Sequence, residues 1–158
     1  MSALKVTISG SSPNPITMER ILKFRAYIPE AKHPYSDGMY YQKDQYLSSF
    51  LRRIRDQFEV THDKYLPFSL SERLMQFTGL LDKEGNEIYE GDITRIIEWP
   101  NNLYPNHGVP NVLIGKIEFY RDAWRNLYHD ARGDWNPLYD DAPHLRIIGN
   151  IFQHPPRS

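Results

Sequence analysis

Hydrophobic and polar residues alternate in several short segments of the chain, and one segment changes to a helical spacing. Phe24, Ala26 and Ile28 alternate with Lys23, Arg25 and Tyr27, which predicts a half-buried strand that ends at Pro29. Between residues 43 and 60 apolar residues recur every three or four positions, so one face of a helix would be apolar. These positions are Leu47, Phe50, Leu51, Ile54 and Phe58.

From Glu72 onward the pattern is typical of β-structure. Residues 74–78 lead to a turn-prone cluster at residues 82–86, and residues 87–89 follow it, which predicts a hairpin. Gly91 is predicted to mark a bulge or a sharp bend, and Gly115 falls on the apolar face of its strand. Strands are also expected over residues 93–99, 113–119 and 145–152, the last one covered on both faces.

The ends of these elements suggest the organisation of the chain. Residues 9–15 read Ser-Gly-Ser-Ser-Pro-Asn-Pro, which disfavours both a helix and a central strand. We therefore predict an N-terminal extension over residues 1–20 and a single domain over residues 21–158. Residues 100–110 are rich in proline and asparagine and are expected to form a long loop.

Composition and charge exclude several classes of protein. The 158 residues include 19 Lys and Arg against 20 Asp and Glu, so the chain lacks the global basic excess of dedicated nucleic-acid binders. It has no cysteine, which excludes disulfides and thiolate metal sites. No apolar run is long enough to span a bilayer. We expect a folded protein of the cytoplasm with no membrane partner.

An aromatic cluster near residue 130 is a candidate for a binding surface. Trp124, Tyr128 and Trp135, with Arg132 between them, can form a stacking platform for nucleic-acid bases or for a partner protein. The alternative, which we favour, is that these rings complete the core of a small sheet, because aromatic side chains dominate core burial.

A second cluster in the same region contains potential metal ligands. His129, Asp130, Asp134 and His144, with Asp140 and Asp141 nearby, carry the nitrogen and oxygen atoms that divalent cations prefer. Their spacing follows no known ligand rule, and turn capping is the favoured explanation of these residue types. No catalytic residue and no cofactor is predicted, since phosphate-binding, dinucleotide-binding and hydrolase motifs are absent from the sequence.

A basic cluster lies within the predicted helix. Arg52, Arg53 and Arg55 sit off its apolar stripe. A solvated helix face is the favoured interpretation, and a patch that binds nucleic acid is the alternative.

Several blocks of the chain resemble the YopX family of phage and prophage proteins. Residues 74–93 read LMQFTGLLDKEGNEIYEGDI and are similar to the hallmark segment of that family. Residues 23–26 with 39–41, residues 115–119 and residues 147–152 resemble its other blocks in the same order. The resemblance implies a compact α+β protein with a barrel-like antiparallel part and a tendency to self-associate. It implies no catalytic residue.

We therefore expect an α+β fold that is mainly antiparallel β, either a small barrel of SH3-like character or a strongly bent sheet, with one amphipathic helix. The favoured function is that of a non-enzymatic, self-associating interaction protein of phage or prophage origin, a homo-oligomer in the bacterial cytoplasm. A β-barrel that binds nucleic acid is the first alternative, and a metal-dependent hydrolase is the second.

Overall fold

The chain forms two compact units, residues 1–79 and residues 80–158. The computed structural model describes residues 3–8, 16–29, 37–57, 69–98, 109–128 and 134–153. Each unit has a hydrophobic core of its own. The predicted boundary at residue 20 stays a prediction.

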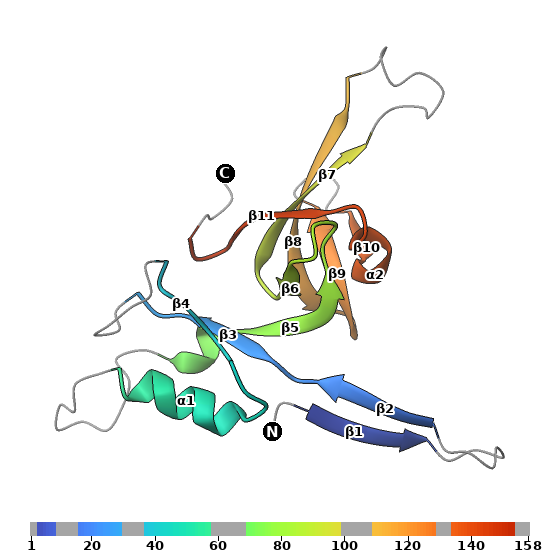
Figure 1. Cartoon of the computed structure of the whole chain (residues 1–158). Helices are drawn as coiled ribbons and strands as arrows, with labels where there is room; N and C mark the ends of the chain where they lie inside the picture. The colour runs from blue at the N-terminus through green and yellow to red at the C-terminus, as the bar shows by residue number, and fades with distance from the viewer. Residues whose placement is uncertain are drawn as a thin grey trace. The chain divides into compact units, whose positions relative to one another are not determined.

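The first unit combines short antiparallel strands with one helix (Figure 1). Strands β1 and β2 form a two-stranded hairpin, and β3 pairs antiparallel with β4 and with the beginning of β5. The elements are β1 (Ala3–Ile8), β2 (Ile16–Ile21), β3 (Phe24–Tyr27), β4 (Met39–Tyr41), α1 (Leu47–Arg55), a short 3-10 helix (Leu70–Glu72) and β5 (Leu74–Leu81), which ends in the second unit.

Helix α1 confirms the predicted amphipathic segment and packs its apolar stripe into the core of the first unit. Phe50 and Ile54 are buried against Ala26, Ile28 and Tyr40. The helix is shorter than the predicted segment. It begins after Tyr46, whose backbone N–H donates to the Asp44 carboxylate at 2.8 Å. Phe58 lies outside the described residues.

The second unit is built on a five-stranded antiparallel sheet of order β10-β9-β8-β7-β11. Figure 1 shows this sheet strongly curled, with α2 beside β10. The predicted α+β fold with a bent antiparallel sheet is therefore confirmed. The elements are β6 (Glu87–Tyr89), β7 (Asp92–Glu98), β8 (Asn111–Tyr120), β9 (Ala123–Tyr128), β10 (Trp135–Pro137), α2 (Leu138–Asp141) and β11 (Arg146–Asn150).

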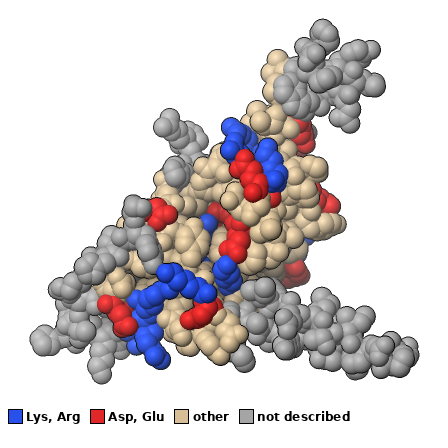
Figure 2. Space-filling model, in the orientation of Figure 1, with Lys and Arg blue, Asp and Glu red and all other residues tan. Residues whose placement is uncertain are grey.

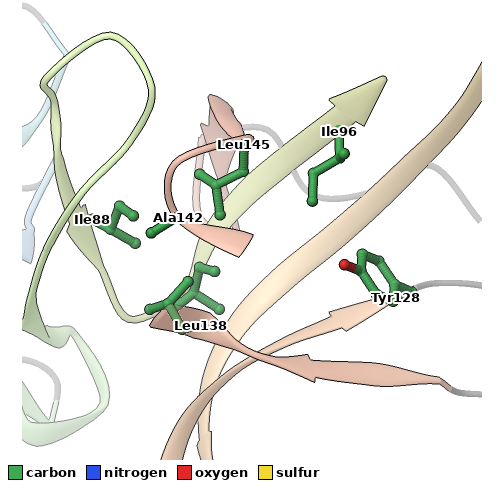
Figure 3. Packing of buried hydrophobic residues seen from close by; sticks show 7 residues of the cluster. Ile88, Ile96, Tyr128, Leu138, Ala142 and Leu145 are labelled. Carbon is green, nitrogen blue, oxygen red and sulfur yellow. The ribbon is translucent and has the colours of Figure 1, made fainter. Parts of the chain in front are cut away.

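One face of the five-stranded sheet carries the core of the second unit. We call it the inner face and the opposite one the outer face. Figure 3 shows the side chains of this core gathered between the sheet and the segment that contains α2. The buried members are Ile88, Ile96, Ile117, Tyr128, Leu138, Ala142 and Leu145.

The predicted turn between β5 and β6 is present, and the structure shows that the carboxylate of Asp82 fixes it. It accepts hydrogen bonds from the backbone N–H groups of Glu84 and Asn86, each at 2.9 Å, and from the N–H of Ile147 at 3.2 Å. Burial raises the pKa of Asp82, but these hydrogen bonds outweigh it and hold the pKa below its ordinary value. Gly91 adopts a φ of 79°, which confirms the predicted bend.

The last strand differs from its prediction. Strand β11 ends at Asn150, and residues 151–153 form a turn. Among the described residues β11 pairs with β7 alone, so it is an edge strand, and its register shifts between Ile147 and Gly149. Ile148 is 43% exposed. The prediction that this strand is covered on both faces is therefore wrong, because an edge strand with a bulge turns residues outward.

Candidate functional site

A buried polar cluster lies on the inner face of the five-stranded sheet, at the point where β7, β8 and β9 run side by side. Thr94 on β7 and Asn126 on β9 are both fully buried. The Thr94 hydroxyl donates to Asn126 Oδ1 at 2.9 Å across the intervening strand β8. This contact is made over Gly115, which pairs with Thr94 in the sheet. A Cβ atom at position 115 would lie 2.0 Å from Asn126 Oδ1, so only glycine leaves room for the hydrogen bond.

Asp141, at the end of α2, joins this cluster to the helix. Its carboxylate accepts hydrogen bonds from Asn126 Nδ2 at 3.0 Å, from Asn136 Nδ2 at 3.1 Å and from the Tyr128 hydroxyl. Burial of the Tyr128 ring, with the hydrogen bond to Asp141, raises the pKa of Tyr128 well above its ordinary value. The hydroxyl therefore remains protonated and acts as a donor at neutral pH.

The geometry of this cluster favours a structural role over a chemical one. Each side-chain group in it donates to or accepts from another member, and such a satisfied network fixes a unique packing of a core. A nucleophile needs a neighbouring base and access to substrate. Thr94 instead directs its proton to an amide oxygen and is fully buried.

The predicted aromatic cluster is divided between the two faces of the sheet. Trp124 and Tyr128 lie on the inner face, where Trp124 meets Phe119 edge-on at a centroid distance of 5.2 Å. Trp135 pairs with Leu127 on the outer face and is 37% exposed. Arg132 lies outside the described residues. The three rings therefore form no common platform.

Trp135 has a cationic partner on the outer face. The guanidinium carbon of Arg125 lies 3.8 Å from the centroid of the Trp135 ring, a distance typical of a stacked cation–π pair. Arg125 also donates from Nε to the carbonyl of Tyr120 at 3.0 Å and lies opposite Glu118 in the sheet. Among the three predicted rings, Trp135 is the exposed one.

Two aliphatic residues extend the exposed area of the outer face. Ile97 on β7 and Val112 on β8 lie directly opposite each other and are 43% and 50% exposed. Ile114 shares this face by strand alternation and is half-buried. We call the set Ile97, Val112, Ile114, Leu127 and Trp135 the outer-face patch. It combines aliphatic area with one aromatic anchor, as the centres of protein interfaces do.

The predicted metal ligands do not form a cluster in the described part of the chain. Within residues 109–128 and 134–153, and in the other described segments, no group of three or more acidic or histidine side chains is placed to hold a metal ion. Asp134 and His144 are exposed, and His129 and Asp130 lie outside the described residues. Asp141, which the sequence places beside these residues, accepts the hydrogen bonds of the polar cluster instead.

The predicted basic cluster occupies the last turn of α1. Arg52 and Arg55 are exposed, while Arg53 is half-buried, donates to the backbone carbonyl of Tyr41 and lies 5.5 Å over the Phe50 ring. Figure 2 shows Lys and Arg side chains gathered in the region where Figure 1 places α1. Arg53 therefore connects the helix to β4. The side chains of Arg52 and Arg55 are exposed to solvent.

Net charge differs between the two units. Residues 1–79 contain 11 Lys and Arg against 8 Asp and Glu, a net charge of +3, and residues 80–158 contain 8 against 12, a net charge of −4. Any anionic partner is therefore expected to approach the first unit.

Comparison with known families adds one finding to this geometry. Residues 23–157 match the family model described as YopX protein. The chain belongs to the YopX family. No curated protein matches the chain. The YopX match includes the polar cluster, the outer-face patch and α1, and it begins after the β1–β2 hairpin. In the part of this YopX protein that the structure describes, no helix is long and apolar enough to cross a membrane.

Sequence reasoning did not predict the two asparagines of the polar cluster. Asn126 and Asn136 carry no motif, and asparagine in a sequence is more often a turn residue than a core residue. One signal was available: Gly115 interrupts the apolar face of a strand, and a glycine there indicates a close approach by another group.

Proposed function

We propose that this YopX-family protein is a non-enzymatic interaction protein of phage or prophage origin that self-associates in the bacterial cytoplasm. The observation that carries the proposal is the outer-face patch, where Ile97 and Val112 expose 43% and 50% of their surface on a regular sheet. Exposed apolar side chains that lie opposite each other on one face of a sheet mark a candidate interaction site. The saturated polar cluster on the opposite face supports the non-enzymatic part.

The proposed partner for the outer-face patch is a second copy of the chain. A two-fold contact requires a surface that is complementary to itself. The patch meets this requirement because aliphatic side chains lie beside charges of both signs, with Lys116 paired to Glu118 and Glu118 opposite Arg125. Two copies related by a two-fold axis can therefore bring Arg125 of each toward Glu118 of the other while they bury Val112.

Light scattering on the eluate of a size-exclusion column tests this proposal. The wild-type protein is expected to exceed the 18.7 kDa of one chain at micromolar concentration. Val112→Lys is expected to reduce the mass to that of a monomer, because it places a charge within the patch. Tyr139→Lys is the matched control, since Tyr139 is 70% exposed on α2. A monomeric wild-type protein, or equal dissociation of both variants, contradicts the proposal.

Nucleic-acid binding by the first unit is the second candidate function. It is supported by the net charge of +3 on residues 1–79 and by the exposure of Arg52 and Arg55. Binding of a labelled oligonucleotide, followed by fluorescence anisotropy at several salt concentrations, tests it. The variant Arg52→Ala/Arg55→Ala is expected to weaken binding and to reduce the salt slope by about 2, because each phosphate contact contributes about 0.9.

The control for this measurement is Lys83→Ala/Arg146→Ala, which removes the same charge from exposed positions of the second unit. It is expected to leave the salt slope unchanged. Absence of binding at low salt contradicts this candidate and leaves the self-association proposal untouched.

A further inference from the structure

Strand β10 presents Trp135 on the outer face of the five-stranded sheet and Asn136 on the inner face. Trp135 pairs with Leu127 of β9 and is 37% exposed. Asn136 follows it and projects to the opposite face, where its Nδ2 donates to the Tyr128 hydroxyl and to Asp141 Oδ1, each at 3.1 Å. This short strand therefore connects the buried polar cluster with the outer-face patch.

Contacts on both sides of Trp135 fix the backbone of β10. The Asn136 side chain is held by the polar cluster, and the carbonyl of Asp134 accepts a hydrogen bond from the N–H of Tyr128 at 2.9 Å. Among the described residues β10 pairs with β9 alone, and its three residues make it short compared with a typical strand. These contacts therefore supplement its ladder hydrogen bonds and hold it beside β9.

Arg125 holds the Trp135 ring on the outer face. Its guanidinium carbon lies 3.8 Å from the ring centroid, and its Nε donates to the carbonyl of Tyr120 at 3.0 Å. A side chain that is already held in one orientation loses little conformational freedom when a partner covers it. The stacked pair is therefore preorganised for binding.

Trp135 has the properties of an interface anchor, the residue whose burial contributes most to the affinity of a contact. Tryptophan and arginine are enriched among such residues, which lie among neighbours that exclude water from them. Trp135 lies opposite the aliphatic Leu127 and shares the outer face with Ile97 and Val112. It is the aromatic member of the outer-face patch.

We propose that Trp135 is the anchor of the contact between two copies of the chain, and that the polar cluster positions it through Asn136. The occupant is a second copy because Trp135 belongs to the outer-face patch, so the inference rests on the self-association proposed above. It adds the residue that carries most of the affinity. It also gives the polar cluster a role in association, since Asn136 acts through the strand that carries the ring.

Sedimentation velocity of the full-length protein over a range of concentrations tests the anchor. Trp135→Ala is expected to weaken self-association by about tenfold or more. Tyr139→Ala is the matched control, because it removes an aromatic ring that is 70% exposed on α2 and lies outside the patch. It is expected to leave the association unchanged. Equal weakening by both variants, or none by Trp135→Ala in an associating wild type, overturns the proposal.

Two asparagine variants test the positioning role. Asn136→Ala removes two hydrogen bonds of the polar cluster from β10, and Asn126→Ala removes two from β9. Both are expected to lower Tm, because each leaves Asp141 with one donor fewer. Asn136→Ala is expected to weaken the association of the folded protein by about fivefold more than Asn126→Ala does. Equal weakening at a similar loss of stability overturns the positioning role.

A spectroscopic signature reports the ring itself. In protein labelled with 5-fluorotryptophan, the fluorine resonance of Trp135 is identified by its loss in Trp135→Ala. Below the concentration at which the chain associates, this resonance is expected to shift in Asn136→Ala and to stay in place in Asn126→Ala. An unchanged resonance in Asn136→Ala contradicts the coupling between the polar cluster and the ring.

These outcomes separate the anchor from the proposed function. A monomeric wild-type protein contradicts self-association, and the anchor with it. If Val112→Lys dissociates the wild-type oligomer while Trp135→Ala associates as the wild type does, self-association stands and the anchor fails alone. If Trp135→Ala dissociates the oligomer and Val112→Lys does not, the anchor stands and the aliphatic part of the patch lies outside the contact.

Discussion

At the residue scale, Gly115 is required for space and not for backbone conformation. Its φ lies outside the left-handed region that Gly38, Gly79, Gly85 and Gly91 adopt. Its role is to let the Thr94 hydroxyl reach Asn126 across a strand. A single hydrogen atom at this position therefore keeps a polar contact intact inside the core.

We expect Gly115→Ala to destabilise the protein by about 2–4 kcal/mol, because the added methyl group displaces the Asn126 side chain and leaves buried polar atoms without partners. Urea denaturation measures the free energy of unfolding. The double variant Gly115→Ala/Asn126→Ala is expected to cost less than the sum of the single variants, since the displaced group is gone. Strict additivity would contradict the proposed clash.

Tyr128 makes stability depend on pH in the alkaline range. Its pKa is raised in the folded protein above the ordinary value of 10.0, so above pH 10 the unfolded chain loses this proton before the folded protein does. The contribution is fully present below pH 10 and is lost as the pH rises toward the folded pKa. In Tyr128→Phe the free energy of unfolding is expected to fall less steeply than in wild type above about pH 10. Equal slopes would contradict this assignment.

At the scale of the element, three neighbouring arginines of α1 have different surroundings. Arg53 faces β4 and bonds to the Tyr41 carbonyl, while Arg52 and Arg55 face outward. The positive end groups also suit the C-terminal turn of the helix, where the backbone carbonyls carry partial negative charge.

Alanine substitutions separate these two roles. Arg53→Ala is expected to destabilise the protein by about 1–2 kcal/mol, since it removes a charged hydrogen bond and the packing of the side chain on Phe50. Arg52→Ala is expected to change stability by less than about 0.5 kcal/mol, as exposed substitutions do. Thermal or urea unfolding of the two variants provides the comparison. A larger loss for Arg52→Ala would reverse the assignment.

The elements also show which parts of the structure the sequence determines locally. Alternation predicts one face of β8 that contains Leu113, Gly115, Ile117 and Phe119, and the strand confirms it. The spacing of three and four residues predicts the apolar stripe of α1, which packs into the core as expected. The strand pairing of Trp135 with Leu127 depends on the connection between β9 and β10. No local pattern predicts it, so the sequence alone does not show that Trp135 lies on the opposite face of the sheet from Trp124 and Tyr128.

The polar cluster could not be predicted for a related reason. Thr94, Asn126 and Asp141 are separated by 32 and 15 positions. Only the sheet order and the placement of α2 bring them together. Asp141 beside Asp140 and His144 has the residue types of a metal ligand or a turn cap, and its actual role as the acceptor of three side-chain donors depends on those distant partners.

At the scale of the whole molecule, the charge of the two units differs in sign. The first unit carries +3 and the second −4. Two copies of the second unit therefore repel each other weakly. A polyanion is instead attracted to the first unit. The two candidate functions consequently respond to salt in opposite directions.

We expect self-association through the outer-face patch to strengthen when the salt concentration rises from about 0.05 to 0.3 M, because salt screens the repulsion between acidic units and leaves apolar burial intact. Any affinity for nucleic acid is expected to fall over the same range. Sedimentation velocity at both salt concentrations measures the first effect, and oligonucleotide binding measures the second. An oligomer that dissociates in the higher salt would indicate a contact made by charges instead of the patch.

The two edges of the five-stranded sheet have a consequence for solubility. Strand β10 is three residues long and contains Pro137, and β11 is interrupted by its bulge at Ile148. Short strands, prolines and bulges are the devices by which proteins prevent the uncontrolled addition of further strands. A chain that exposes apolar side chains on its outer face is thereby protected from growing into fibrils. If the chain associates through this sheet as proposed, these edges direct the contact to the outer face and away from the strand edges.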